Sequence, residues 1–213
     1  MTEPTVFGDA QIHEMVSAIL ELESLPEIVQ AGHPVLRAQA AEFTGQVTAA
    51  ELARLVDVMR NVMLEAPGVG LAAPQIGIPL QLAVLEDLYE VSAEIAAERV
   101  REPLEFFAMI NPGYQPLGTE TAAFYEGCLS MSGWQAVVDR PAAITLDYVD
   151  VSGTTVSRGF NGWQARIVQH ETDHLGGMLY IDKAFTRSLT STAEYAAHWA
   201  EPGIARARAG LHF

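Results

Sequence analysis

The chain has 213 residues, 49% of them hydrophobic, and its 12 basic and 27 acidic side chains give a net charge of −15 at pH 7. This length suits one domain with a sizeable core, and the negative charge argues against broad contact with nucleic-acid backbones. Because no apolar run approaches the roughly 20 residues that cross a bilayer and the acidic N-terminus has no Lys or Arg to begin a signal peptide, we expect a cytoplasmic protein that binds no membrane and no specific nucleic-acid sequence.

The first half of the chain predicts two amphipathic helices. Residues 11–24 place apolar side chains at helical intervals. A second helix should start after Thr48, because Thr48 and Glu51 have the spacing of a capping box, and it should end before Pro67. Both helices are expected to face the core.

The centre of the chain predicts two strands around an acidic insert. A glycine-rich segment at 66–79 is followed by an apolar run at 80–86, and a second apolar run covers 106–112. Both runs are typical of strands. The acidic stretch 85–105 between them is predicted to be a helix or a loop.

Further apolar runs and one more helix follow. Residues 122–160 predict an antiparallel meander, because turn signals interrupt the apolar runs. The turn signals are Ser132-Gly133, Arg140-Pro141 and Ser152-Gly153. A helix is predicted over 163–177, with its N-cap near Asn161 and a closing pair of glycines. The whole pattern indicates an α+β fold.

This last helix contains QHETDHLGG, which places His170 and His174 one turn apart on one face, around Glu171. Two imidazoles at this spacing can share a metal ion, but a catalytic ion usually needs a third protein ligand. One class of zinc protease takes a third His at the position where Tyr180 stands, so that class is excluded. Another class takes a glutamate from a later helix, and Glu194 is the candidate. A zinc endopeptidase is therefore the first alternative function.

Cys128 is the stronger candidate for the third ligand. It is the only cysteine of the chain, so it cannot form an intramolecular disulfide. A divalent ion favours the deprotonated thiolate that coordinates it. Ligands from Cys128, His170 and His174 would leave one tetrahedral position open for water.

Three motifs occur in a fixed order along the chain. They are GVGLAAPQ at 68–75, EGCLS at 126–130 and QHETDH at 169–174. One such motif alone would be weak evidence, but all three in this order make the chain resemble the peptide deformylase family. The segment GHPVLR at 32–37 also resembles the early part of that family, so the likeness extends over roughly 26–185.

The resemblance implies removal of the formyl group from the N-terminal formyl-methionine of new bacterial polypeptides, with release of formate. A metal-bound water would attack the formyl carbon, with Glu171 as general base and then general acid. The side chain of Gln75 and the backbone N–H of Leu129 would stabilise the oxyanion. Because members of the family characteristically use ferrous iron, we expect Fe²⁺, with Zn²⁺, Ni²⁺ or Co²⁺ able to occupy the same site.

The resemblance also implies contacts with the N-formylmethionyl peptide substrate. Gly70 would hydrogen-bond an extended peptide. Val69, Ile167 and Trp134 are candidates to line an apolar pocket for the methionine side chain, with ordinary core packing as the alternative. Arg166 stands where the family often has an apolar residue, and we expect its stem to pack in the pocket wall with its charge outward.

Other charged residues have expected supporting roles. Glu126 and Arg140 should pair across a hairpin and brace the turn at Cys128. Asp173 should either orient a ligand histidine or lie on the helix surface. The weakly basic segment 183–213 could contact the ribosome transiently, although a solvated tail is the plainer interpretation. A non-catalytic, metal-bound binding module is the second alternative function.

The predicted fold is a single α+β domain with mostly antiparallel sheets packed around a central metal-binding helix. Residues 1–25 would form an N-terminal helical extension, 26–185 the catalytic domain and 186–213 a C-terminal tail. This division rests on the extent of the family resemblance.

Overall fold

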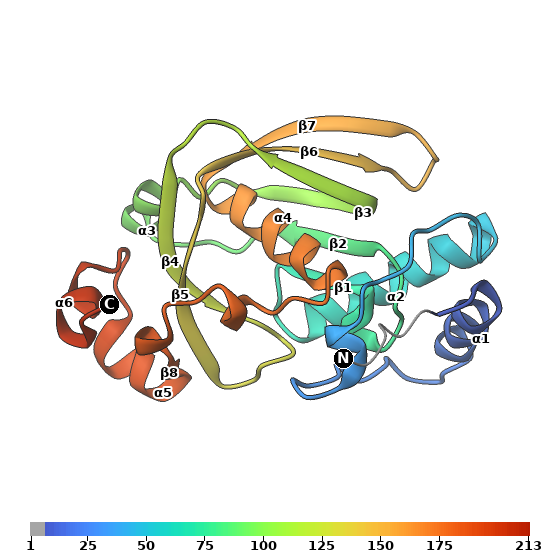
Figure 1. Ribbon diagram of the computed structural model, residues 1–213, viewed down its shortest axis with the longest axis horizontal. Helices are drawn as coiled ribbons and strands as arrows, with labels where there is room; N and C mark the ends of the chain where they lie inside the picture. The colour runs from blue at the N-terminus through green and yellow to red at the C-terminus, as the bar shows by residue number, and fades with distance from the viewer. Residues whose placement is uncertain (1–6) are drawn as a thin grey trace, which may run out of the picture.

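The computed structural model describes residues 7–213 and contains two antiparallel sheets (Figure 1). The larger sheet has the strand order β1–β2–β3–β6–β7, and the smaller has the order β4–β5–β8. The strands of the larger sheet are β1 (Gly70–Ala72), β2 (Leu82–Asp87), β3 (Leu104–Pro116), β6 (Ala143–Val149) and β7 (Thr155–Asn161). Those of the smaller sheet are β4 (Thr121–Gly127), β5 (Trp134–Pro141) and β8 (Thr190–Ser191).

Helices surround the sheets and one helix lies between them. The α-helices of the described residues are α1 (Asp9–Leu20), α2 (Ala49–Glu65), α3 (Ala93–Arg99), α4 (Gly162–Leu175), α5 (Thr192–Glu194) and α6 (Ala205–Leu211). A π-helical turn at Tyr195–Trp199 continues α5. Within residues 7–213, no helix has the length and apolar character needed to cross a membrane.

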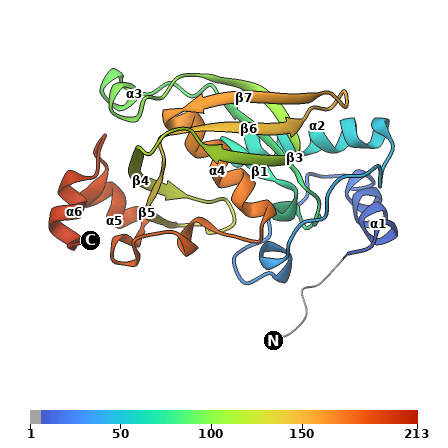
Figure 2. The ribbon, with the colours of Figure 1, turned by 45° about the horizontal axis from the view of Figure 1, so that its top comes forward.

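The central helix α4 contacts both sheets (Figure 2). It packs on all five strands of the larger sheet and on β5 of the smaller one. Ala165 and Val168 are fully buried as a result. The helix follows Asn161 and ends at Leu175, before Gly176, close to the predicted bounds. The expected α+β fold of mostly antiparallel sheets around a central helix is therefore confirmed.

The N-terminal helix α1 packs against α2. Ile12 and Val16 are fully buried in the same apolar cluster as the inner face of α2. The helix ends at Leu20, four residues before the predicted end at 24. Helices in proteins depend on packing, and beyond Leu20 the next apolar side chain, Leu22, is 50% exposed and lacks a core partner.

The start of α2 depends on the predicted capping box. The Thr48 hydroxyl accepts a hydrogen bond from the Glu51 backbone N–H (3.2 Å), and the Glu51 carboxylate accepts one from the Thr48 N–H (2.8 Å). We expect Thr48→Ala to lower the free energy of unfolding by about 1 kcal/mol, because a helix N–H loses its acceptor. Urea unfolding measures this. The control Thr119→Ala, at an exposed loop position, should stay within about 0.5 kcal/mol, and equal losses in both variants would contradict the cap.

The prediction of one meander over 122–160 is wrong. β4 and β5 form one hairpin and β6 and β7 another, but β5 and β6 belong to different sheets. The turns at Gly133 and Gly153 lie where predicted, each with a positive φ (82° and 85°) that favours glycine. Arg140-Pro141 instead ends β5, and the chain then crosses to the larger sheet. No local signal distinguishes this crossing from a hairpin turn, because it is set by the pairing of β6 with the earlier strand β3.

The acidic insert is helical only over α3. Before it, β2 extends to Asp87, whose carboxylate accepts hydrogen bonds from Arg101 at 2.8 and 2.7 Å. After it, β3 is longer than the predicted run at 106–112 and continues through Pro112. A proline inside a strand is tolerated at a bulge, and the register of β3 against β6 shifts around this position.

The C-terminal segment is not a solvated tail. β8 pairs with β5, and Ala207 of α6 is buried against Tyr125 and Val137 of the smaller sheet. Trp199 packs against the same cluster. Burial of the apolar side chains of this segment contributes more than solvation of its few basic side chains. The segment therefore covers the smaller sheet (Figure 1).

Candidate metal centre and active site

Helix α4 presents His170 and His174 on one face, with ring centroids 5.0 Å apart. Burial and the neighbouring His170 hold the pKa of His174 well below its usual range, so this imidazole is neutral. Burial also lowers the pKa of His170, but its contacts with Cys128 and Glu126 outweigh burial and raise that pKa. A metal ion that binds this pair would therefore displace a proton.

Cys128 lies directly after β4 and faces the two histidines. Its Sγ is 3.3 Å from His174 Nε2, and the ligand atoms of Cys128, His170 and His174 all lie within 4.8 Å of one another. One thiolate and two imidazoles suit a divalent transition-metal ion, so the donor set fits a resident metal. Glu194, the alternative third ligand, has a side chain that is 66% exposed and lies beside His198 instead.

The predicted pair of Glu126 and Arg140 is confirmed and is deeply buried. Arg140 Nε and Nη2 donate to the two carboxylate oxygens of Glu126 at 2.6 and 2.9 Å. His170 Nδ1 lies 2.9 Å from Glu126 Oε2, which leaves His170 Nε2 for a metal. Burial alone would raise the pKa of Glu126, but Arg140 and His170 hold that pKa well below its usual range. Glu126 is thus a carboxylate that orients a ligand histidine.

Asp173 does not contact a ligand histidine, and it does not lie on the helix surface. Its carboxylate accepts a hydrogen bond from Arg140 Nη1 (2.7 Å) and two from Lys183 Nζ (both 2.8 Å). The prediction is wrong on both counts because the hairpin places Arg140 between Asp173 and Glu126. Asp173 therefore supports the ligand histidines only indirectly, by holding Arg140. Lys183, its second charged partner, was not predicted from the sequence.

The prediction for Arg166 is also wrong, since its charge points inward. The side chain is 4% exposed, and Nη1 donates to Glu126 Oε1 (2.5 Å) and to the Val138 carbonyl (3.0 Å). Nη2 donates to the Ala122 carbonyl. These partners belong to β4 and β5, so only the packing of α4 on the hairpin determines the direction of the guanidinium.

Glu171 follows the first histidine and its carboxyl group is buried beside it. Burial raises the pKa of Glu171 to about 7. Oε2 of this carboxyl has no hydrogen-bond partner among the described residues. A side chain of this kind can accept and return a proton near neutral pH.

Two groups beside Cys128 can donate hydrogen bonds to a bound molecule. The Ala72 N–H donates to Gln75 Oε1 (2.8 Å), which turns Gln75 Nε2 toward Cys128 Sγ (3.7 Å) and Ser130 Oγ (3.3 Å). The backbone N–H of Leu129 makes none of the hydrogen bonds found in residues 7–213. The structure thus brings both predicted oxyanion donors next to the three ligand residues.

The sequence profile of the polypeptide deformylase family matches residues 25–189. The chain belongs to this family. Peptide deformylase 3 of Streptomyces avermitilis is 52% identical over 186 residues, which cover 87% of this chain and 83% of the relative. Peptide deformylase 1 of Streptomyces coelicolor is 49% identical over 200 residues, which cover 94% and 92% of the two chains.

Solved deformylases share the fold. The class I type b peptide deformylase from Acinetobacter baumannii, solved with Met-Ala-Ser bound, superposes with a TM-score of 0.68 at 29% identity and covers 76% of this chain and 99% of its own. Deformylases are metal-dependent hydrolases of N-terminal formyl groups. Family membership therefore favours the deformylase over the zinc endopeptidase.

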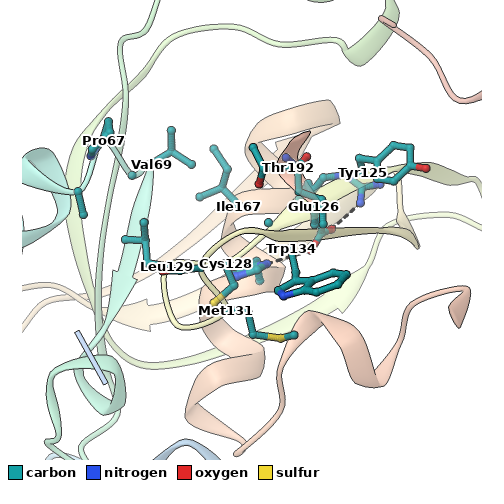
Figure 3. Close-up of a pocket in the computed structure, with 18 of the residues that line it drawn as sticks. Pro67, Val69, Tyr125, Glu126, Cys128, Leu129, Met131, Trp134, Ile167 and Thr192 are labelled. Carbon is teal, nitrogen blue, oxygen red and sulfur yellow. Dashed lines mark hydrogen bonds and ion pairs between the residues drawn. The ribbon is translucent and has the colours of Figure 1, made fainter. Parts of the chain in front are cut away.

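In this deformylase, a cavity of about 620 Å³ is lined by Cys128 and His170, and Figure 3 shows Cys128 among the side chains that line it. Val69, Gly70, Ile167 and Trp134 all line it, as the resemblance implied. Ile167 is buried, whereas Trp134 is 48% exposed at the rim. The structure brings these residues together, and their contacts with substrate remain predictions.

The cavity wall includes residues that sequence reasoning missed. They are Arg99 of α3 and, from the C-terminal segment, Thr192 and Tyr195. The last two reach the cavity because β8 pairs with β5, with Ser191 opposite Trp134. A two-residue strand leaves no recognisable pattern in the sequence, so nothing pointed to these positions.

Proposed function

We propose that this chain removes the formyl group from the N-terminal formyl-methionine of newly made bacterial polypeptides and releases formate. The observation that carries the proposal is the convergence of the ligand atoms of Cys128, His170 and His174 within 4.8 Å of one another, with the first two residues in the wall of a cavity. The cavity also contains Glu171 and Gln75. Family membership and the two Streptomyces relatives support the same activity.

Cys128, His170 and His174 would hold the metal ion, and we propose Fe²⁺, with Zn²⁺, Ni²⁺ or Co²⁺ able to replace it. A divalent cation bound there would act as a Lewis acid that makes water a nucleophile at neutral pH. Glu126 supports this assignment, because its bond to His170 Nδ1 orients the ring. Anomalous scattering at the metal edges would identify the element.

Glu171 is proposed as the general base and then the general acid. Its unpartnered Oε2 would take the proton of the attacking water and later pass it to the leaving amine. The charge that develops on the formyl oxygen would be met by Gln75 Nε2 and the Leu129 N–H. Both donors are fixed by the fold before the substrate arrives, which is the arrangement that stabilises an oxyanion most effectively.

The methionine side chain is proposed to lie against Val69 and Ile167, with Trp134 at the rim. Gly70 would approach the substrate backbone. These positions suit an extended peptide that enters along β1. The three side chains and Gly70 line one cavity, which supports a common role.

Gly70 also limits the position of Glu171. A Cβ atom added at residue 70 would overlap the Glu171 carboxyl group. We therefore expect Gly70→Ala to lower kcat about 100-fold, because displacements of about 1 Å in an active site have effects of that size. Formate release measures it. In the control Gly113→Ala the new Cβ meets nothing within 4 Å, so activity should persist; equal losses in both variants would contradict the steric argument.

The proposed function is tested with formyl-Met-Ala-Ser and an assay for formate. We expect formate from the purified protein, loss of activity with a chelator, and recovery when Fe²⁺ is added back under anaerobic conditions. Cleavage of an internal peptide bond would favour the endopeptidase instead. Neither product from metal-loaded protein would favour the non-catalytic binding module.

We further propose that 26–185 form the catalytic domain and that the protein acts in the cytoplasm, where nascent chains are made. A transient contact with the ribosome would bring it to this substrate. Co-sedimentation with ribosomes, with and without high salt, tests the contact.

A further inference from the structure

Arg99, in the wall of the cavity, contacts only neutral groups, whereas the neighbouring arginines form ion pairs. Its Nε donates to the Pro202 carbonyl (3.0 Å) and its Nη2 to the Glu201 carbonyl (3.3 Å). Its guanidinium carbon lies 5.0 Å from the centre of the Trp163 ring. All of these partners are neutral groups.

The neighbouring arginines are neutralised. Arg166 pairs with Glu126, and Arg101, which also lies over Trp163, pairs with Asp87. Among residues 7–213, no carboxylate forms an ion pair with Arg99. Arg99 is therefore the one arginine of the cavity wall that lacks an anionic partner, and it is half-buried.

The side chain is also held in place and has donors to spare. The two carbonyls of the C-terminal segment and the Trp163 ring fix the guanidinium at the edge of the cavity. A guanidinium has five N–H groups, and only two are used by these carbonyls. A fixed, partly desolvated arginine with free donors is suited to bind a carboxylate.

We propose that Arg99 is a specificity-determining residue that binds a carboxylate of the peptide substrate. The inference rests on the proposed function. Trp163, over which Arg99 lies, precedes His170 by seven residues, so it lies about 10 Å along α4 from the first ligand histidine. An extended peptide rises about 3.3 Å per residue. The carboxylate therefore belongs to an acidic side chain one or two residues after methionine, or to the C-terminus of a short peptide.

Because the molecule is strongly acidic, a preference for acidic peptides would indicate a local cation in the substrate site. With a net charge of −15, the chain as a whole repels acidic peptides. Glu171 is the one carboxyl group of the cavity wall without an arginine partner among the described residues, and it lies about 12 Å from Trp163 along α4. A preference for acidic substrates can therefore arise only from a local cation.

The test compares kcat/KM of the metal-loaded enzyme for matched pairs of formyl peptides. The pairs are formyl-Met-Asp-Ala-amide against its Asn analogue, formyl-Met-Ala-Asp-amide against its Asn analogue, and formyl-Met-Ala-Ala as free acid against amide. We expect the native chain to prefer the acid of at least one pair about 10-fold. The first two pairs report a side chain and the third reports the terminal carboxylate.

The same ratios are then measured in variants. Arg99→Gln should bring the preferred ratio close to one, and Arg99→Lys should retain part of it because the charge remains. Arg158→Gln is the matched control, since Arg158 lies 4.5 Å from the Phe160 ring, forms no ion pair among the described residues, and is not in the cavity wall. If Arg99 had only a structural role, Arg99→Gln would change kcat/KM equally for all the peptides and leave the acid-to-neutral ratios unchanged.

Two results would overturn the inference. One is formate release by the native chain without preference for the acid in any pair. The other is a preference that survives in Arg99→Gln. If no peptide yields formate, the proposed function fails and the inference fails with it.

Discussion

Glu171→Gln is expected to lower kcat for deformylation by about 100-fold to 10,000-fold, the usual contribution of a general acid and base. The glutamine keeps the shape of the side chain but cannot accept the proton of water. Glu171 is not among the three residues whose ligand atoms converge, so the metal content should stay at the native level. Formate release and metal analysis on the same sample measure the two quantities.

The matched control for this variant is Glu194→Gln. Glu194 is the third ligand that a zinc endopeptidase would have used, and its side chain is largely exposed. Its loss should leave both metal content and kcat within about two-fold of native. Loss of the metal in Glu194→Gln, or full activity in Glu171→Gln, would refute the assigned roles.

Arg140→Met is expected to lower the free energy of unfolding by about 3 kcal/mol and to weaken metal retention. Arg140 is 2% exposed and joins Glu126 to Asp173, so its removal leaves two buried carboxylates partly uncompensated. Breaking a buried pair from one side costs about 3 to 5 kcal/mol. We place the effect at the lower end because Arg166 and Lys183 still contact the two carboxylates. Metal retention should fall because Glu126 orients His170.

An exposed ion pair provides the comparison. Arg206 lies 3.2 Å from Glu201, with side chains that are 58% and 42% exposed. Arg206→Met should change stability by no more than about 1 kcal/mol, because solvent screens surface pairs. Urea unfolding of both variants, together with the metal content after dialysis, tests the argument. Equal stability in the two variants would show that the buried network does not support the site.

The residues of the reaction centre could be predicted from the sequence because their chemistry is local. His170 and His174 lie one helical turn apart, so their common face follows from helix geometry, and Glu171 is adjacent to the first of them in the sequence. The start of α2 at Thr48 can also be predicted from the sequence, because a capping box involves only four residues. Cys128 can be proposed as the third ligand because its thiolate suits a metal ion, but no local rule joins a loop to a distant helix, so its position beside the histidines comes from the tertiary structure.

The directions of long side chains were decided by the tertiary structure. The predicted directions of the Arg166 and Asp173 side chains are wrong for the same reason. Each side chain can reach several positions, and the choice depends on buried charges that β4, β5 and α4 bring together from distant parts of the chain. A buried charge must find a partner, and the sequence does not say which partner will be near.

The sequence alone therefore determined which side chains could carry out the chemistry, through motifs that operate within a few residues. Only the tertiary structure decided how these side chains are held and what surrounds them. The crossing from β5 to β6, and the approach of Thr192 and Tyr195 to the cavity after β8, follow from long-range strand pairing. Such pairing is stabilised by burial of surfaces that are separated in sequence, so no local pattern records it.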